Sequence, residues 1–216
     1  MVIAQLHSIQ VGRTAPLGPQ RIPSAFRKHS VAGQVAVGAL GLAGDEQADR
    51  MVHGGQDMAV YAYPLAHYPV WAGDFPQHQA QFVPGGVGEN LTIDGLLETE
   101  VYVGDVHRIG SAIMQVCQPR QPCFKLALHF NDNQMPKAMV RSGRAGWYYR
   151  VLQEGSIEAG DDIHLDRRPN PDFRFDRLVE IVSFRNASQS EIEAIADLEG
   201  LPGWMHEAAR ERLSSN

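Results

Sequence analysis

Residues 101–117 read VYVGDVHRIGSAIMQVC. Three runs rich in β-branched and apolar residues are separated by the turn-forming pairs Gly104-Asp105 and Gly110-Ser111. Short runs with turns at this spacing predict an antiparallel β-meander. A chain built from such strands favours a barrel or a sandwich over alternating strand–helix–strand units.

Similar patterns lie on both sides of this meander. Residues 2–7 alternate in hydrophobicity with a period of two, residues 34–37 (Gln-Val-Ala-Val) form another short candidate strand, and residues 151–165 repeat the theme between glycine turns. Helices are expected near residues 64–74 and 134–142, where the alternation lapses. We therefore predict a mainly-β fold, a barrel with a few peripheral helices.

The pattern changes towards the C-terminus. A linker rich in charge and proline covers residues 166–172, and helical spacing follows it. Ser188 and Glu191 form the signature of a capping box at the start of a helix. We divide the chain into a β domain at 1–168 and a helical domain at 172–216, and we expect the helical domain to be removable without unfolding the β domain.

Composition excludes several classes of protein. The 216 residues carry a net charge of −6, whereas non-specific nucleic-acid binders usually have a basic excess. No apolar run reaches the roughly 18–20 residues that cross a bilayer, and the first residues lack the pattern of a secretory signal. Two cysteines are too few for a disulfide scaffold, an iron–sulfur ligand set or an all-cysteine zinc site. We expect a cytoplasmic protein without nucleic-acid or membrane partners.

The segment Cys117-Gln-Pro-Arg-Gln-Pro-Cys-Phe-Lys125 carries the strongest chemical signal. Its two prolines stiffen the loop. Arg120 shares a face with Cys123 if the loop is polyproline II, and Lys125 does so if Cys123 opens a strand. Two cations beside a thiol favour its thiolate form, which attacks electrophiles and binds soft metals. Cys117 lies on the apolar alternation of a strand, so we interpret it as a buried structural thiol.

Two glycine-rich segments are weaker candidates. The run His53-Gly54-Gly55 lets a ligand approach the backbone closely, but a Gly-Gly turn beside a hydrogen-bonded histidine is also common in β proteins. The loop that ends in Glu89-Asn90 brings a carboxylate and an amide to the start of a strand. A nucleophilic pair of Cys123 and His53 stays open, because it depends on hydrogen-bond reach. A zinc hydrolase is disfavoured, since neither H-x-x-x-H nor H-E-x-x-H occurs.

Four motifs, in their order along the chain, resemble a MOSC domain, the module named for the C-terminal part of molybdenum cofactor sulfurase. They are Gly41-Leu-Ala-Gly-Asp45, Val52-His-Gly-Gly55, Gly88-Glu-Asn-Leu91 and Gln118-Pro-Arg-Gln-Pro-Cys-Phe-Lys-Leu126. The segment Ser24-Ala-Phe-Arg-Lys28 resembles an early segment of this family, and the tail with Gly200-Leu-Pro-Gly-Trp204 resembles the three-helix extension of its YiiM-like group. The resemblance covers nearly the whole chain, and the cysteine segment is its most specific part.

The resemblance implies a MOSC-type β-barrel with a small C-terminal three-helix appendage. It also implies molybdenum cofactor (Mo-molybdopterin), a pterin that carries a dithiolene and a phosphate. By its place in the motif, Cys123 would be the catalytic cysteine and the molybdenum ligand. The other residues implied to bind the cofactor are Arg120, Lys125, His53, Gly54, Gly55, Glu89, Asn90 and Lys28. No zinc and no iron–sulfur cluster is expected.

The same resemblance implies an oxidoreductase that serves detoxification by reducing N-hydroxylated compounds such as hydroxylamino-purines. The chain lacks cysteines for a cluster and a dinucleotide-binding fingerprint, so electrons are expected from a separate flavoprotein or iron–sulfur protein. Two alternatives use the same cysteine and stay open. One is a sulfur carrier or cofactor chaperone with Cys123 as persulfide or ligand, and the other is a binding module without turnover. A homodimer is also left open.

Overall fold

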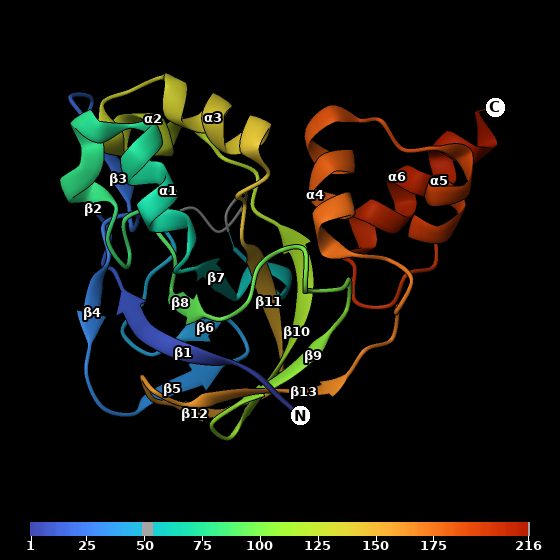
Figure 1. The fold of residues 1–216 in the computed structure, drawn as a ribbon, viewed down its shortest axis with the longest axis horizontal. Helices are drawn as coiled ribbons and strands as arrows, with labels where there is room; N and C mark the ends of the chain where they lie inside the picture. The colour runs from blue at the N-terminus through green and yellow to red at the C-terminus, as the bar shows by residue number, and fades with distance from the viewer. Residues whose placement is uncertain (49–53, 216) are drawn as a thin grey trace.

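The protein is described by a computed structural model that covers residues 1–48 and 54–215. Within these residues, seven strands close into a barrel in the order β13–β9–β10–β11–β7–β8–β1, and β1 pairs back onto β13 (Figure 1). Neighbouring strands are antiparallel except for β7 and β8, which run parallel. The barrel strands are β1 (Val2–Val11), β7 (Val60–Pro64), β8 (Leu91–Asp94), β9 (Val106–Ile109), β10 (Ala112–Pro119), β11 (Trp147–Gln153) and β13 (Asp162–Arg167).

Smaller elements surround the barrel. The short strands are β2 (Ala15–Leu17), β3 (Ile22–Ser24), β4 (His29–Val31), β5 (Val35–Gly38), β6 (Gly41–Leu42) and β12 (Gly155–Ile157). The helices are α1 (His67–Asp74), α2 (Phe124–Phe130), α3 (Gln134–Ser142), α4 (Phe175–Phe184), α5 (Gln189–Ile195) and α6 (Gly203–Ser214), with 3₁₀ turns η1 (Gln56–Met58) and η2 (Pro76–Gln81). No helix in the described part of the chain is long and apolar enough to span a membrane.

Two apolar clusters hold these elements together. The first fills the barrel, where Ile9, Ile93 and Met114 are fully buried. The second lies under α1, α2 and α3 and contains Trp71 and Phe130, together with the rings of Phe26 and Tyr61. Burial of such side chains contributes about 1.5–3 kcal/mol each relative to exposure. The helices are therefore fixed over one end of the barrel, and the pocket lies where they meet it.

Most of the strand and helix predictions agree with the structure. The mainly-β barrel is confirmed, the alternation at 2–7 lies in β1, and the helices expected near 64–74 and 134–142 are α1 and α3. The meander is correct for β9 and β10 but wrong for residues 101–103. There Tyr102 forms a single β-bridge to Arg174, the residue just before α4. Residues 101–103 therefore pair with the connection to α4 and not with a barrel strand.

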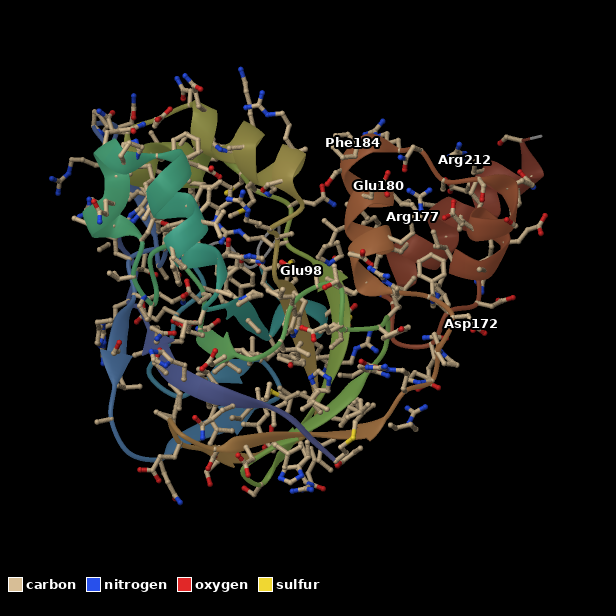
Figure 2. All side chains as sticks on the ribbon, viewed as in Figure 1. Glu98, Asp172, Arg177, Glu180, Phe184 and Arg212 are labelled. Carbon is tan, nitrogen blue, oxygen red and sulfur yellow. The ribbon has the colours of Figure 1, made fainter. Side chains whose placement is uncertain are left out.

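The three C-terminal helices pack against the side of the barrel (Figure 1). The predicted capping box is confirmed, since the Ser188 hydroxyl accepts from the Glu191 N–H at 3.3 Å and the Glu191 carboxylate accepts from the Ser188 N–H at 2.7 Å. Arg177 forms an ion pair with Glu180 within α4 (both labelled in Figure 2) and a second one with Glu191 that joins α4 to α5, both at 2.6 Å. These pairs are only partly buried, so each contributes little to the stability of the fold.

The linker before α4 is tied to the barrel by hydrogen bonds. The Arg168 guanidinium donates to both carboxylate oxygens of Asp105, at 2.9 and 2.8 Å, and the Asn170 amide donates to the carbonyl oxygens of Val103 and Glu199. The division at 1–168 and 172–216 stays a proposal. The hydrogen bonds of Arg168 and Asn170 connect the two parts across this division.

Candidate functional site

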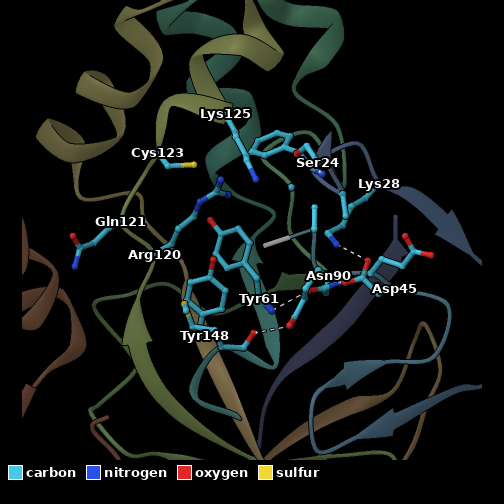
Figure 3. Close-up of a pocket in the computed structure, with 17 residues that line it drawn as sticks. Ser24, Lys28, Asp45, Tyr61, Asn90, Arg120, Gln121, Cys123, Lys125 and Tyr148 are labelled. Atoms are coloured by element: carbon cyan, nitrogen blue, oxygen red, sulfur yellow. Dashed lines mark hydrogen bonds and ion pairs between the residues drawn. The ribbon is translucent and has the colours of Figure 1, made fainter. Parts of the chain in front are cut away.

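A pocket opens where the proline-rich loop, the segment 24–28 and the strands β7 and β11 converge (Figure 3). Its wall includes Cys123, Arg120 and Lys125 from the cysteine segment, with Lys28 and Asn90 opposite. Five residues predicted to act together are thus brought to one cavity from three distant parts of the sequence. Their cofactor-binding roles stay predictions.

Cys123 is the residue immediately before α2 and has extended backbone angles, φ −109° and ψ 174°. The condition considered above, that Cys123 opens a strand, is therefore not met, because a helix follows it. Pro122 keeps Gln121 out of the helical region, so the helix begins only after the loop. The buried side chains of Leu126 and Phe130 are four residues apart, so they lie on one face of α2. Lys125 lies in the first turn of α2, and its side chain reaches the same pocket as Cys123.

Arg120 is almost completely buried, with an exposed fraction of 7%. Its guanidinium lies 5.2 Å from the ring centre of Phe26 and 4.8 Å from that of Tyr61, and it donates a hydrogen bond to the Val87 carbonyl oxygen. Cation–π contacts of this kind are attractive, especially away from water. Arg120 is therefore a rigid positive charge in the pocket wall, held by the protein before any ligand arrives.

Lys125 is also buried, with an exposed fraction of 9%. Within residues 1–48 and 54–215, no carboxylate forms an ion pair with its ammonium group. A buried cation without a counter-ion is costly, because burial removes hydration that nothing replaces. The Lys125 side of the pocket is therefore suited to an anionic ligand.

Lys28 has a different environment, because its charge is already paired. The Lys28 Nζ lies 2.6 Å from Asp45 Oδ1, and Asp45 also accepts from the Gly12 N–H at 2.7 Å and from the Asn90 amide at 2.8 Å. Burial lowers the pKa of Lys28, and the charge of Asp45 opposes this shift. Asn90 uses its amide oxygen to accept from the Tyr61 N–H at 3.1 Å. This side of the pocket is a closed polar network that stiffens the wall.

We expect Lys28→Met to lower the free energy of unfolding by about 3–5 kcal/mol, because it leaves the buried carboxylate of Asp45 without its cation. Urea denaturation measures the change. Lys137→Met is the matched control, since Lys137 is exposed on α3 and should change stability by less than about 0.5 kcal/mol. Equal effects of the two variants would contradict the pairing.

Glu89 is not among the described residues that line the pocket, and its cofactor-binding role stays a prediction. Its carboxylate is fully buried and accepts from the Tyr68 hydroxyl, the Gly85 N–H at 2.7 Å and the Thr92 hydroxyl at 2.9 Å. Burial raises the pKa of Glu89. The preceding residue lines the pocket instead: Gly88 has φ +86°, and a Cβ there would meet the Phe26 ring at 3.1 Å. The hydrogen bonds of Glu89 hold the loop in place, and position 88, which lines the pocket, has room only for glycine.

The other glycine motif is only partly described. His53 lies outside the described residues, so its predicted role and its pairing with Cys123 stay open. Gly55 lines a neighbouring hollow with β5, β6 and Glu154, which shares Asp45 and Gln47 with the pocket of Cys123. Gly54 and Gly55 are not among the described residues that line that pocket, and their cofactor-binding role stays a prediction. Among the described residues, no three His, Cys, Asp or Glu side chains are grouped as metal ligands.

Comparison with known proteins agrees with the motif order. The family model described as MOSC domain matches residues 49–164. The chain belongs to the MOSC domain family. Protein YiiM of Escherichia coli (strain K12) is 45% identical over 150 residues, which are 69% of this chain and 67% of that protein. A crystal structure of YiiM from Geobacillus stearothermophilus has a TM-score of 0.81 at 34% identity, and the match covers 97% of this chain and 99% of that chain.

A further relative of this MOSC protein is a protein named Reductase from Gibberella moniliformis. It is 36% identical over 197 residues, which are 90% of this chain. The match spans about a third of the fungal protein, 34% of its length. A reductase activity of this MOSC chain is therefore a proposal.

Asp45, Tyr61 and Tyr148 also line the MOSC pocket and were not predicted as site residues. Asp45 ends the motif Gly41-Leu-Ala-Gly-Asp45, which by itself indicates only a turn. Tyr61 and Tyr148 are paired across the neighbouring strands β7 and β11, 87 positions apart by their numbers, and their rings lie 5.1 Å apart. Alternation marks each of them as a strand residue, but no local signal pairs these two strands.

Proposed function

We propose that this protein binds molybdenum cofactor through Cys123 and reduces N-hydroxylated compounds with electrons from a separate donor protein. The observation that carries the proposal is the position of the Cys123 side chain in one pocket with two buried cations, Arg120 and Lys125. A thiolate is a good ligand for a soft metal, and the cations offset the negative charge of a dithiolene and a phosphate. The donor set of the pocket therefore fits this cofactor.

When bound, the cofactor supplies the two-electron redox chemistry that the side chains lack. The net reaction is R–NHOH + 2 e⁻ + 2 H⁺ → R–NH₂ + H₂O, in which the N–O bond breaks and new N–H and O–H bonds form. Arg120 and Lys125 would hold the negatively charged cofactor, and the rings of Phe26, Tyr61 and Tyr148 give the pocket flat apolar walls. Such walls suit a planar substrate and exclude water.

The family comparisons support this function at a coarser level. The chain is a MOSC domain protein, and one relative carries the name Reductase. The N-hydroxylated substrate and the separate flavoprotein or iron–sulfur donor are parts of the proposal. The cysteine count and the lack of a dinucleotide-binding fingerprint favour a separate donor.

We expect the protein, purified from a molybdenum-replete host that makes the cofactor, to carry about one molybdenum atom per chain. Elemental analysis measures the metal, and fluorescence after denaturation detects the released pterin. Reduced viologen should be oxidised when a hydroxylamino-purine is added. Zinc in place of molybdenum, or neither metal nor pterin, would contradict the proposal. Molybdenum and pterin without viologen oxidation would favour the chaperone alternative.

A further inference from the structure

Two tyrosine side chains line the pocket, and their hydroxyl groups have different environments. Tyr61 is fully enclosed, and its O–H donates to the Ala145 carbonyl oxygen at 2.8 Å. That hydroxyl is therefore committed to the protein. Its ring serves as a wall and as a support for the guanidinium of Arg120.

Tyr148 is half-buried and lies beside Tyr61 next to Arg120 (Figure 3). Within the described part of the chain, its hydroxyl donates no hydrogen bond to a protein acceptor. The charged groups that act on this hydroxyl are Arg120 and Cys123. A phenolic O–H is protonated at physiological pH, so it is available as a donor.

The backbone holds this side chain in a fixed place. Tyr148 pairs with Tyr61 of β7 on one side and with Gln118 of β10 on the other, and its ring packs on the ring of Tyr61. A group held by a three-strand ladder and a ring contact does not have to be reoriented when the substrate binds. Such preorganised donors are effective when charge develops on the atom they face.

We propose that Tyr148 is a catalytic residue that binds the substrate directly, with its hydroxyl donating a hydrogen bond to the oxygen of the N–OH group beside Cys123. This inference rests on the proposed function. The N–O bond breaks during the reaction, and negative charge grows on the departing oxygen as it does so. The hydrogen bond strengthens with that charge, so it lowers the barrier more than it tightens substrate binding.

The test compares Tyr148→Phe with the intact chain, both purified with cofactor. Loss of one preorganised donor is expected to lower the dye-driven kcat on the order of 10²-fold, with a much smaller change in KM. A second measurement needs no turnover. Calorimetric titration of the oxidised protein should show that the variant loses the wild-type preference for a hydroxylamino-purine over the matching aminopurine. Molybdenum content and melting temperature should not change.

Tyr102→Phe is the matched control, because Tyr102 lies outside the pocket with its ring over the Arg168 guanidinium at 3.9 Å. It should keep the wild-type rate and the wild-type preference. A Tyr148→Phe protein with wild-type kcat and preference would overturn the inference while the proposed function stands. A rate loss matched by an equal loss of molybdenum would also overturn it, because Tyr148 would then retain the cofactor. A wild-type protein inert towards every N-hydroxylated base would overturn both.

Discussion

Cys123→Ser is expected to reduce the viologen-driven reduction of a hydroxylamino-purine to the background rate. A hydroxyl is a far poorer ligand for a soft metal than a thiolate, whereas the fold should be unaffected. The side chain is partly exposed and lies at the start of α2, where serine is a favourable residue. The melting temperature should therefore stay close to that of the wild type, and molybdenum analysis shows whether the metal is lost with the activity.

Cys117→Ser is the matched control for this substitution. Cys117 is fully buried in β10, and its thiol donates to the Gly200 carbonyl oxygen at 3.1 Å. Burial raises the pKa of Cys117 to about 12, so it is not a thiolate at neutral pH. The prediction that Cys117 is a buried structural thiol is confirmed. Its serine variant should keep the rate, and a loss of activity in both variants, or in this one alone, would contradict the assignment of Cys123.

The fold was predictable where the signal was local. Period-two alternation is a property of each strand on its own, and Ser188 and Glu191 are close enough in sequence to identify a helix start. The failure at residues 101–103 shows the limit. Val101 and Val103 are buried and flank Tyr102 in the sequence, as the alternating residues of a strand do. Their backbone hydrogen-bond partners, however, lie in the linker and at the start of α4 rather than in a barrel strand. Alternation reports burial, and it does not report the pairing partner.

The site was predictable from the chemistry of one segment but not from its neighbours. Arg120, Cys123 and Lys125 lie within six residues, so any compact loop brings them together. Glu89 and Gly88 show the opposite case. The two residues are adjacent in a tight turn with a positive φ at Gly88, and the sequence does not say which of them faces the pocket. The closed network of Lys28 and Asp45 depends on contacts between loops, which no motif encodes.

Phe175→Ala is expected to lower the free energy of unfolding strongly. Phe175 opens α4, is fully buried in the barrel's apolar cluster and lies 6.3 Å, ring centre to ring centre, from Trp147 of β11. Removing a buried phenylalanine ring costs about 3–5 kcal/mol, because it loses transfer free energy and leaves a cavity. Trp204→Ala is the control from the same helical region. Trp204 is 50% exposed, so its loss should cost less than about 1 kcal/mol in urea denaturation.

Truncation after Arg168 extends the same argument to the whole helical region. It removes Phe175 together with Leu178, which is also fully buried, and it exposes the face of Trp147 that they cover. Every described residue that lines the pocket lies between Ser24 and Tyr148, so the truncated chain keeps them all. We therefore expect a large fall in melting temperature, with cofactor content and dye-driven rate retained per folded molecule at low temperature. An unchanged melting temperature would show that the helices are an independent domain. Loss of molybdenum from a soluble, folded truncation would show that the helices hold the pocket in shape.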